Sequence, residues 1–392
     1  MKRITTLLLT ALLTLSAYAQ LSDGYYRLQC KQTGRYLAVH NNYVNKEAAK
    51  QTGQIDLQSL ETIDGFDNIV NDPGSIIYLK KTSKGYVIEA QGFTTESKGL
   101  YLKLTKVNDA YRIYSDLVYN GVKYTRYLRD YQTNSGQTYI TTDASKSTNW
   151  EWYITPVSAS DKQYFGLKGD VKVGKSYYTT IYATFPIKLG SGMKAFAVNS
   201  LTDSSCVLKD IGNVIPAKTP VVIQCAGKDA SSNKVTPLAS DNASVNGDKL
   251  DGVVFCYPVL VMGKERRNNP MWNAKDYDPE TMRILGEADG KLCFITANKA
   301  DYPYLAANRA YLPVAKGSGS QGSSAKGSAL IITTDGTTGI ESIDGATAIN
   351  AVKNTAAVQQ QGTYTLSGVR LPENSKPLKG LYIKDGKVIA IR

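Results

Sequence analysis

Asn149-Trp150-Glu151-Trp152-Tyr153-Ile154-Thr155-Pro156-Val157 is the stretch that decides the fold of the first part of this chain. Its apolar residues recur at every second position, which is typical of a β-strand with one buried face. On that alternation Trp150, Trp152 and Ile154 share one face of the strand. We therefore expect Trp152 to lie in an apolar core.

A loose repeat precedes this stretch. Each copy has a strand with an aromatic residue near its middle, a polar turn and a second strand that carries Tyr. The copies occupy residues 25–28 with 34–39, 76–79 with 85–88, 99–102 with 111–114, and 124–128 with 137–140. Periodicity of two dominates the whole chain, so the sequence predicts an all-β protein. A β-trefoil buries equivalent strands around a threefold axis, and recurrence of this kind is expected of it.

Two motifs carry a resemblance to a known family. The Gly34-Arg35-Tyr36-Leu37 turn and strand, together with the closing Trp-Glu-Trp-Tyr-Ile-Thr-Pro segment, resemble the ricin-type β-trefoil lectins found at the start of secreted Bacteroidetes-type proteins. The resemblance implies a lectin-like β-trefoil over residues 20–157. The Gln-x-Trp signature of that family is absent, so no sugar-binding residue carries over from it.

Three further segments follow. Residues 158–335 contain strand-like runs at 177–185, 194–198, 206–211, 221–225, 283–285, 292–295 and 330–333 and look like a β-sandwich module of the same secreted proteins. Residues 336–361 are small and polar and indicate a linker. Residues 362–392 form a strand-turn-strand pattern that resembles the C-terminal tail of type IX secretion substrates. The alternative for this tail is a strand pair that caps the fold.

The N-terminus predicts export. Lys2 and Arg3 precede an apolar run too short to span a bilayer, and Ala17-Tyr18-Ala19 fits signal-peptidase cleavage. Residues 1–19 are therefore expected to be a cleaved signal peptide of a secreted or cell-surface protein. No later segment has the length and apolarity of a membrane span.

The charge limits the partners. The formal charge of +12 becomes +10 when Lys2 and Arg3 are removed with the signal peptide. This excess is spread thinly, which favours weak contact with anionic surfaces or polysaccharide over nucleic-acid binding. The oligomeric state is not predicted.

Five cysteines leave at least one thiol unpaired in an exported chain. One interpretation is a set of buried, inert thiols. The other is a single disulfide bond, for which Cys206 and Cys225 are the best pair.

Catalytic motifs are weak. His40 is the only histidine, which excludes histidine-cluster metal sites and limits triad chemistry. The acidic stretch from Asp276 to Asp289 could line a pocket or bind Ca²⁺, or it could be a solvated loop. We expect no enzyme activity, no cofactor and no metal.

A binding site can be proposed only from local composition. Sugar C–H groups pack on aromatic rings, while sugar hydroxyls need nearby polar acceptors. Asp130, Tyr131 and Asn134 combine these groups in one expected turn after a strand ending at Leu128. The alternative is an ordinary Asn/Asp-rich turn. Two functions follow: a non-catalytic protein that binds a glycan or polysaccharide through the trefoil, or a structural or adhesive surface protein whose trefoil binds no sugar.

Overall fold

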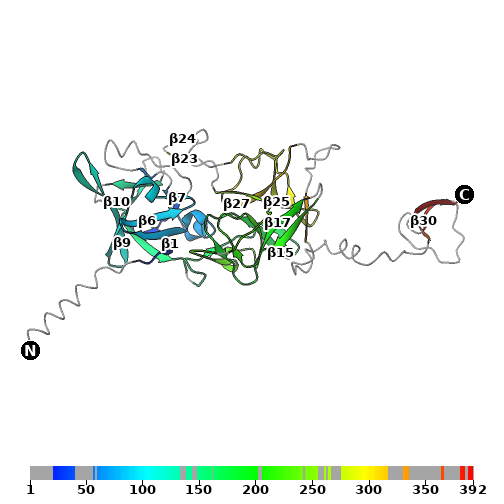
Figure 1. The fold of residues 1–392 in the computed structure, drawn as a ribbon, viewed down its shortest axis with the longest axis horizontal. Helices are drawn as coiled ribbons and strands as arrows, with labels where there is room; N and C mark the ends of the chain where they lie inside the picture. Colours follow the sequence, from blue (N-terminus) through cyan, green and yellow to red (C-terminus); the bar gives the residue numbers. More distant parts are fainter. Residues whose placement is uncertain are drawn as a thin grey trace, which may run out of the picture. The chain divides into compact units, whose positions relative to one another are not determined.

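A computed structural model shows an all-β protein (Figure 1). It describes residues 21–39, 56–57, 60–132, 138–143, 148–160, 162–201, 205–241, 243–254, 260–261, 264–265, 275–316, 330–334, 363–365, 380–384 and 387–391. Its described helices are single short turns: α3 (Phe66–Ile69), η1 (Pro73–Ser75), η2 (Glu96–Lys98) and η3 (Ala230–Ser232). The all-β prediction is confirmed.

The first segment forms one twelve-stranded sheet, drawn in blue to green in Figure 1. Its strands are β1 (Gly24–Cys30), β2 (Tyr36–Val39), β3 (Asp56–Leu57), β4 (Leu60–Ile63), β5 (Ile77–Thr82), β6 (Gly85–Ala90), β7 (Phe93–Thr94), β8 (Lys103–Val107), β9 (Ala110–Tyr119), β10 (Val122–Gln132), β11 (Thr138–Asp143) and β12 (Glu151–Pro156). Strand β1 pairs with β12, β5 and β2, so the first and last strands of the segment are neighbours. These pairings do not by themselves define a threefold arrangement, and the trefoil stays a prediction.

Trp152 lies in the core as predicted. Its side chain is fully buried and its indole Nε1 donates to the Leu128 carbonyl oxygen at 3.1 Å. The prediction that Trp150 shares this face is wrong. Asn149 has a left-handed backbone with φ of 62°, and β12 begins only at Glu151, so the alternation does not extend back to Trp150.

The second segment has a sandwich-like architecture, drawn in green to yellow in Figure 1. Its strands are β13 (Phe165–Gly166), β14 (Val171–Val173), β15 (Ser176–Ile181), β16 (Ile187–Lys188), β17 (Lys194–Leu201), β18 (Ser205–Asp210), β19 (Val214–Ile215), β20 (Val221–Cys225), β21 (Lys234–Pro237), β22 (Asp251–Val253), β23 (Leu260–Val261), β24 (Lys264–Glu265), β25 (Met282–Ala288), β26 (Lys291–Ile295), β27 (Arg309–Pro313) and β28 (Leu330–Thr334). Ten of them form the order β14-β15-β20-β17-β18-β28-β26-β25-β27-β22. The pairing of β18 with β28 is parallel, and every other pairing among the described strands is antiparallel.

Local turn chemistry sets one hairpin of this sheet. Asp289 and Gly290 both have positive φ, at 52° and 75°, between β25 and β26. A two-residue turn of this kind matches the twist of the flanking strands, and Asp-Gly is well suited to it. From sequence alone, Ala288-Asp289-Gly290-Lys291 predicts a hairpin turn, and the structure confirms it.

The two segments meet at a buried cation. Arg27 on β1 is 1% exposed, and its guanidinium donates to the carbonyl oxygens of Ile69 at 3.0 Å, Val70 at 3.3 Å and Tyr164 at 3.0 Å. It also donates to the Ser75 hydroxyl. Burial lowers the pKa of Arg27 to about 10, against the opposing effect of Asp72. The cation is thus held mainly by carbonyl dipoles at the end of α3 and from the second segment.

An apolar cluster crosses the same junction. Ile76 and Val157 pack in one core with Phe165 and Phe185 of the second segment. Among the described residues, those up to β28 belong to one compact unit. The structure does not test whether residues 20–157 fold without the rest, so that boundary stays a prediction.

Arg27→Ala should lower the free energy of unfolding of residues 20–392 by about 3–5 kcal/mol, because buried carbonyl groups lose their donor. Urea denaturation followed by Trp fluorescence measures this. Lys31→Ala, which removes a partly exposed ion pair with Asp109, is the control and should have a much smaller effect. Equal losses of unfolding free energy in the two variants would contradict the prediction that the hydrogen bonds of Arg27 stabilise the fold.

Asp248 supports an irregularity in β17. Its Oδ1 accepts from the backbone N–H groups of Val198 at 3.0 Å and Leu250 at 3.1 Å, next to a register shift after Val198. Its Oδ2 is buried without a hydrogen-bond partner. Burial raises the pKa of Asp248 to about 6, despite these N–H donors.

Asp248→Asn should therefore stabilise the protein in a pH-dependent way. A raised pKa means that the native state favours the protonated carboxyl over the carboxylate. The stabilising contribution of Asp248 to folding is therefore present below about pH 4 and is lost as pH rises through about 6. We expect the variant to gain about 1–3 kcal/mol at pH 8 and to lose that advantage near pH 4. Urea titrations at both pH values test this, with the exposed Asp229→Asn as control. A gain that does not change with pH would be contrary to the prediction.

The described part of the C-terminal tail is a unit of its own. Strands β29 (Thr363–Thr365), β30 (Gly380–Lys384) and β31 (Lys387–Ile391) form an antiparallel sheet in that order. The predicted strand-turn-strand pattern is confirmed over β30 and β31, and β29 is a third strand that sequence analysis did not assign. No helix in the described residues has the length and apolarity that a bilayer crossing requires.

Candidate functional site

Asp130 lies within a strand and not in a turn. Strand β10 runs to Gln132 and pairs with β11 as far as Gln132 and Thr138, so the predicted strand end at Leu128 is wrong. Cross-strand pairing here outweighs the turn preference of Asp and Asn. The Asp130 side chain is fully buried.

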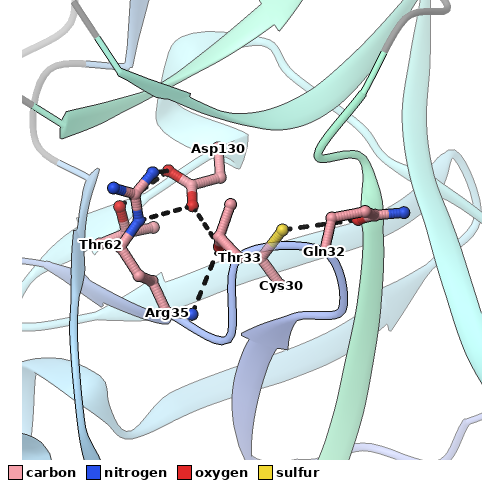
Figure 2. A network of polar contacts seen from close by, with 6 residues as sticks. All are labelled: Cys30, Gln32, Thr33, Arg35, Thr62 and Asp130. Atoms are coloured by element: carbon pink, nitrogen blue, oxygen red, sulfur yellow. Dashed lines mark hydrogen bonds and ion pairs between the residues drawn. The ribbon is translucent and has the colours of Figure 1, made fainter.

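Figure 2 shows the partners of this carboxylate. Arg35 binds it in a bidentate manner, with Nε at 2.9 Å from Oδ2 and Nη2 at 2.9 Å from Oδ1. The Thr33 hydroxyl donates to Oδ2 at 2.6 Å, and the Thr62 hydroxyl donates to Oδ1 at 2.8 Å. Each oxygen thus accepts two hydrogen bonds, which is the full capacity of a carboxylate.

This network ties three parts of the first segment together. Arg35 and Thr33 belong to the turn after β1, Thr62 lies on β4, and Asp130 lies on β10. Inside the same turn, the Cys30 thiol donates to Gln32 Oε1 at 3.6 Å. The geometry gives Asp130 a stabilising role as the buried partner of Arg35, and leaves its oxygens no capacity for a further ligand hydroxyl.

Of the other two predicted site residues, the structure describes only Tyr131, and it lies apart from the Asp130 side chain. Tyr131 is the next residue on the same strand, so its side chain points to the opposite face of the sheet. There Arg129 lies over its ring, with 5.1 Å between the guanidinium carbon and the ring centroid. Asn134 lies outside the described residues. Its place in a binding site stays a prediction.

Three aromatic rings are in contact on that opposite face. Tyr114 on β9 and Tyr127 on β10 are register partners whose ring centroids are 5.5 Å apart. Tyr127 meets Trp150 edge to face at 4.7 Å. We call Tyr114, Tyr127 and Trp150 the aromatic strip. All three side chains are partly exposed, while their strand neighbours Ile113 and Leu128 are buried in the core.

Charged groups lie at both ends of the aromatic strip. At one end, the Arg112 guanidinium carbon is 4.1 Å from the Trp150 ring centroid, and its Nη2 donates to Glu151 Oε1 at 2.9 Å. At the other end, Asp116 contacts Lys103 at 2.6 Å and Lys123 at 3.2 Å. Hydrogen bonding from Lys103, above all, lowers the pKa of Asp116 to about 2, so this carboxylate is an ionised acceptor at neutral pH.

This arrangement can bind a flat, amphipathic molecule. Tyr and Trp rings offer apolar surface with a polar edge, and they lose little conformational entropy on binding. The Thr105 hydroxyl lies 3.4 Å from the Tyr114 hydroxyl and adds a polar group beside the rings. Aromatic faces with fixed polar ends suit the alternating C–H and O–H surfaces of a sugar.

The cysteine alternatives are resolved for four of the five residues. Cys30, Cys206, Cys225 and Cys293 are free and buried, and Cys256 lies outside the described residues. The predicted alternative of a Cys206–Cys225 bond is wrong because β17 lies between β18 and β20. Two strand spacings are about 9–10 Å, beyond the reach of a disulfide. Burial raises the pKa of Cys206 and of Cys225 to about 12, which makes both thiols unreactive.

The acidic stretch from Asp276 to Asp289 contains a turn at Asp278 and then strand β25, and its carboxylates accept local backbone hydrogen bonds. Asp278 Oδ1 accepts from Glu280 N–H at 2.9 Å, and Glu287 accepts from Gly290 N–H at 2.6 Å. Within the part of the chain that the structure describes, no three His, Cys, Asp or Glu side chains are grouped as metal ligands. His40 lies outside that part.

Comparison with known proteins adds no assignment: no family model matches the chain, and no curated protein or solved structure matches it significantly. The candidate site therefore rests on the geometry of this chain alone.

Asp130→Ala should destabilise residues 20–392 by about 3–5 kcal/mol, because Arg35 would remain buried without its anion. Tyr131→Ala, one residue away on the other face, should cost about 1 kcal/mol or less. Thermal and urea unfolding of both variants measure the difference. A tolerated Asp130→Ala would mean that the network in Figure 2 contributes little to stability.

Proposed function

We propose that this protein is an exported, non-catalytic glycan-binding protein whose aromatic strip is the contact surface. The main observation in support is that Tyr127 contacts both Tyr114 and Trp150 on a partly exposed sheet face. Export is supported by the signal-like residues 1–19, and glycan binding by the resemblance of residues 20–157 to lectins.

The polar groups beside the strip suit orientation of a ligand rather than proton transfer. Asp116 has a lowered pKa and stays ionised, and Glu151 is held by Arg112. A general acid or base works best with a pKa near the working pH, which Asp116 does not have. Ionised carboxylates and guanidinium groups can instead exchange hydrogen bonds with sugar hydroxyls.

A single strip of this size is expected to bind weakly. Binding that rests on ring faces and a few hydrogen bonds typically gives dissociation constants of about 0.1–1 mM for one site, or about −5.5 to −4.1 kcal/mol. Display of many copies on a surface would raise the effective affinity. The proposal therefore concerns attachment to repetitive polysaccharide.

The decisive experiment is a glycan array probed with residues 20–392, followed by titration of each hit by calorimetry. Tyr127→Ala should weaken binding at least about tenfold, because it removes the central ring of the strip. Tyr101→Ala is the matched control, since Tyr101 is a partly exposed Tyr that stacks with Lys84 outside the strip. It should leave the affinity unchanged.

Two results would reject the proposal. Saturable binding that survives Tyr127→Ala would place the site elsewhere on the molecule. No binding to a broad array would favour the alternative, a structural or adhesive surface protein whose trefoil-like segment binds no sugar. Near-ultraviolet circular dichroism of each variant would show that the fold is intact.

A further inference from the structure

A cavity of about 510 Å³ lies where the first and second segments meet. Strands β5, β6 and β7 line one side, and the loops that carry Phe185 and Lys218 line the other. Its volume is within the range of natural ligand pockets. It shares no lining residue with the aromatic strip, and we call it the junction cavity.

One wall of the junction cavity is aromatic. Tyr25 lies between two other rings, with centroid distances of 4.8 Å to Tyr78 and 5.2 Å to Phe185. Burial raises the pKa of Tyr25 and of Tyr78, with a smaller contribution from Glu89 to both. Both phenols therefore stay protonated and can donate hydrogen bonds at neutral pH.

Three charged residues also line the cavity, and two of them are basic. Glu89 is the register partner of Tyr78 across β5 and β6, and Lys80 follows Tyr78 on the same face of β5. Lys80 Nζ is 3.9 Å from Glu89 Oε1, and both side chains are well exposed, at 46% and 36%. Lys218 adds a second ammonium group from the second segment. The cavity thus has two cations and one anion.

Two lining residues have a left-handed backbone conformation, which residues other than glycine rarely adopt. Lys218 has φ of 57° and Gln91 has φ of 51°. Lys218 N–H donates to the Ala183 carbonyl oxygen at 2.7 Å. The Gln91 amide exchanges two hydrogen bonds with the buried Asn308 amide, at 2.6 and 3.0 Å. Left-handed non-glycine residues that the surrounding structure holds in place are concentrated at functional sites.

We propose that the junction cavity binds a carboxylate-bearing sugar residue of an acidic polysaccharide. The ring face of the sugar packs on Tyr78 and Tyr25, and its carboxylate pairs with the ammonium groups of Lys80 and Lys218. Glu89 accepts from a ring hydroxyl. The net positive charge of the lining selects an acid over a neutral sugar, in keeping with the positive charge of the whole chain.

This site is separate from the aromatic strip, and its test distinguishes the two. Residues 20–392 are titrated by calorimetry with a tetramer of α-1,4-linked galacturonic acid and with its methyl ester, which keeps the rings and removes the charge. The acid should bind, the ester should bind at least about tenfold more weakly, and added salt should weaken binding of the acid.

Variants place the binding within the molecule. Lys218→Gly removes the ammonium group and suits the positive φ, so it should fold normally and lower the affinity at least about fivefold. Tyr78→Ala should lower it by a similar factor. The exposed Lys175→Gln, a matched loss of one charge outside the cavity, and Tyr127→Ala in the aromatic strip should both leave it unchanged.

Each contrary result is informative. Equal affinity for acid and ester, or affinity unaffected by both Lys218→Gly and Tyr78→Ala, would overturn the proposal. So would an absence of binding at millimolar tetramer. Loss of acid binding on Tyr127→Ala alone would assign the ligand to the aromatic strip and reject the junction cavity as its site.

Discussion

The buried guanidinium of Arg27 is the constraint on which the joining of the described first and second segments depends. A cation removed from water needs hydrogen-bond acceptors, and the two Nη groups of Arg27 find them in carbonyl groups of both segments. Strand β1, which carries it, is also the neighbour of β12, β5 and β2. The position of α3 and the approach of Tyr164 are therefore set together with the central strand of the sheet.

The features that sequence analysis predicted well are those that neighbouring residues determine. Alternation placed Trp152 in the core, and the Asp289-Gly290 dipeptide placed a hairpin turn. Runs of β-branched and aromatic residues located seven of the sixteen described strands of the second segment, namely β15, β17, β18, β20, β25, β26 and β28. In each case the deciding physics acts over a few residues along the chain.

The failures have the opposite character. Asp130 looked like a turn residue because its partners, Arg35 and Thr62, lie 95 and 68 positions away. Trp150 left the expected face because one left-handed residue, Asn149, preceded it. The aromatic strip joins β9, β10 and the residue before β12, and no single-sequence pattern shows that these strands are neighbours. The alternation of Arg112, Tyr114 and Asp116 does indicate that these three side chains share one strand face. It does not indicate which strand lies beside that face.

Strand β28 occupies a place in its sheet that is out of order with the chain. It is inserted between β18 and β26, with parallel pairing to β18 and antiparallel pairing to β26. Until residues 330–334 have left the ribosome, both neighbours present an unpaired edge, and exposed edges invite association with other chains. The second segment must consequently complete its folding late in synthesis or afterwards. A chain that has not yet closed this sheet is also one that could still pass through a narrow channel.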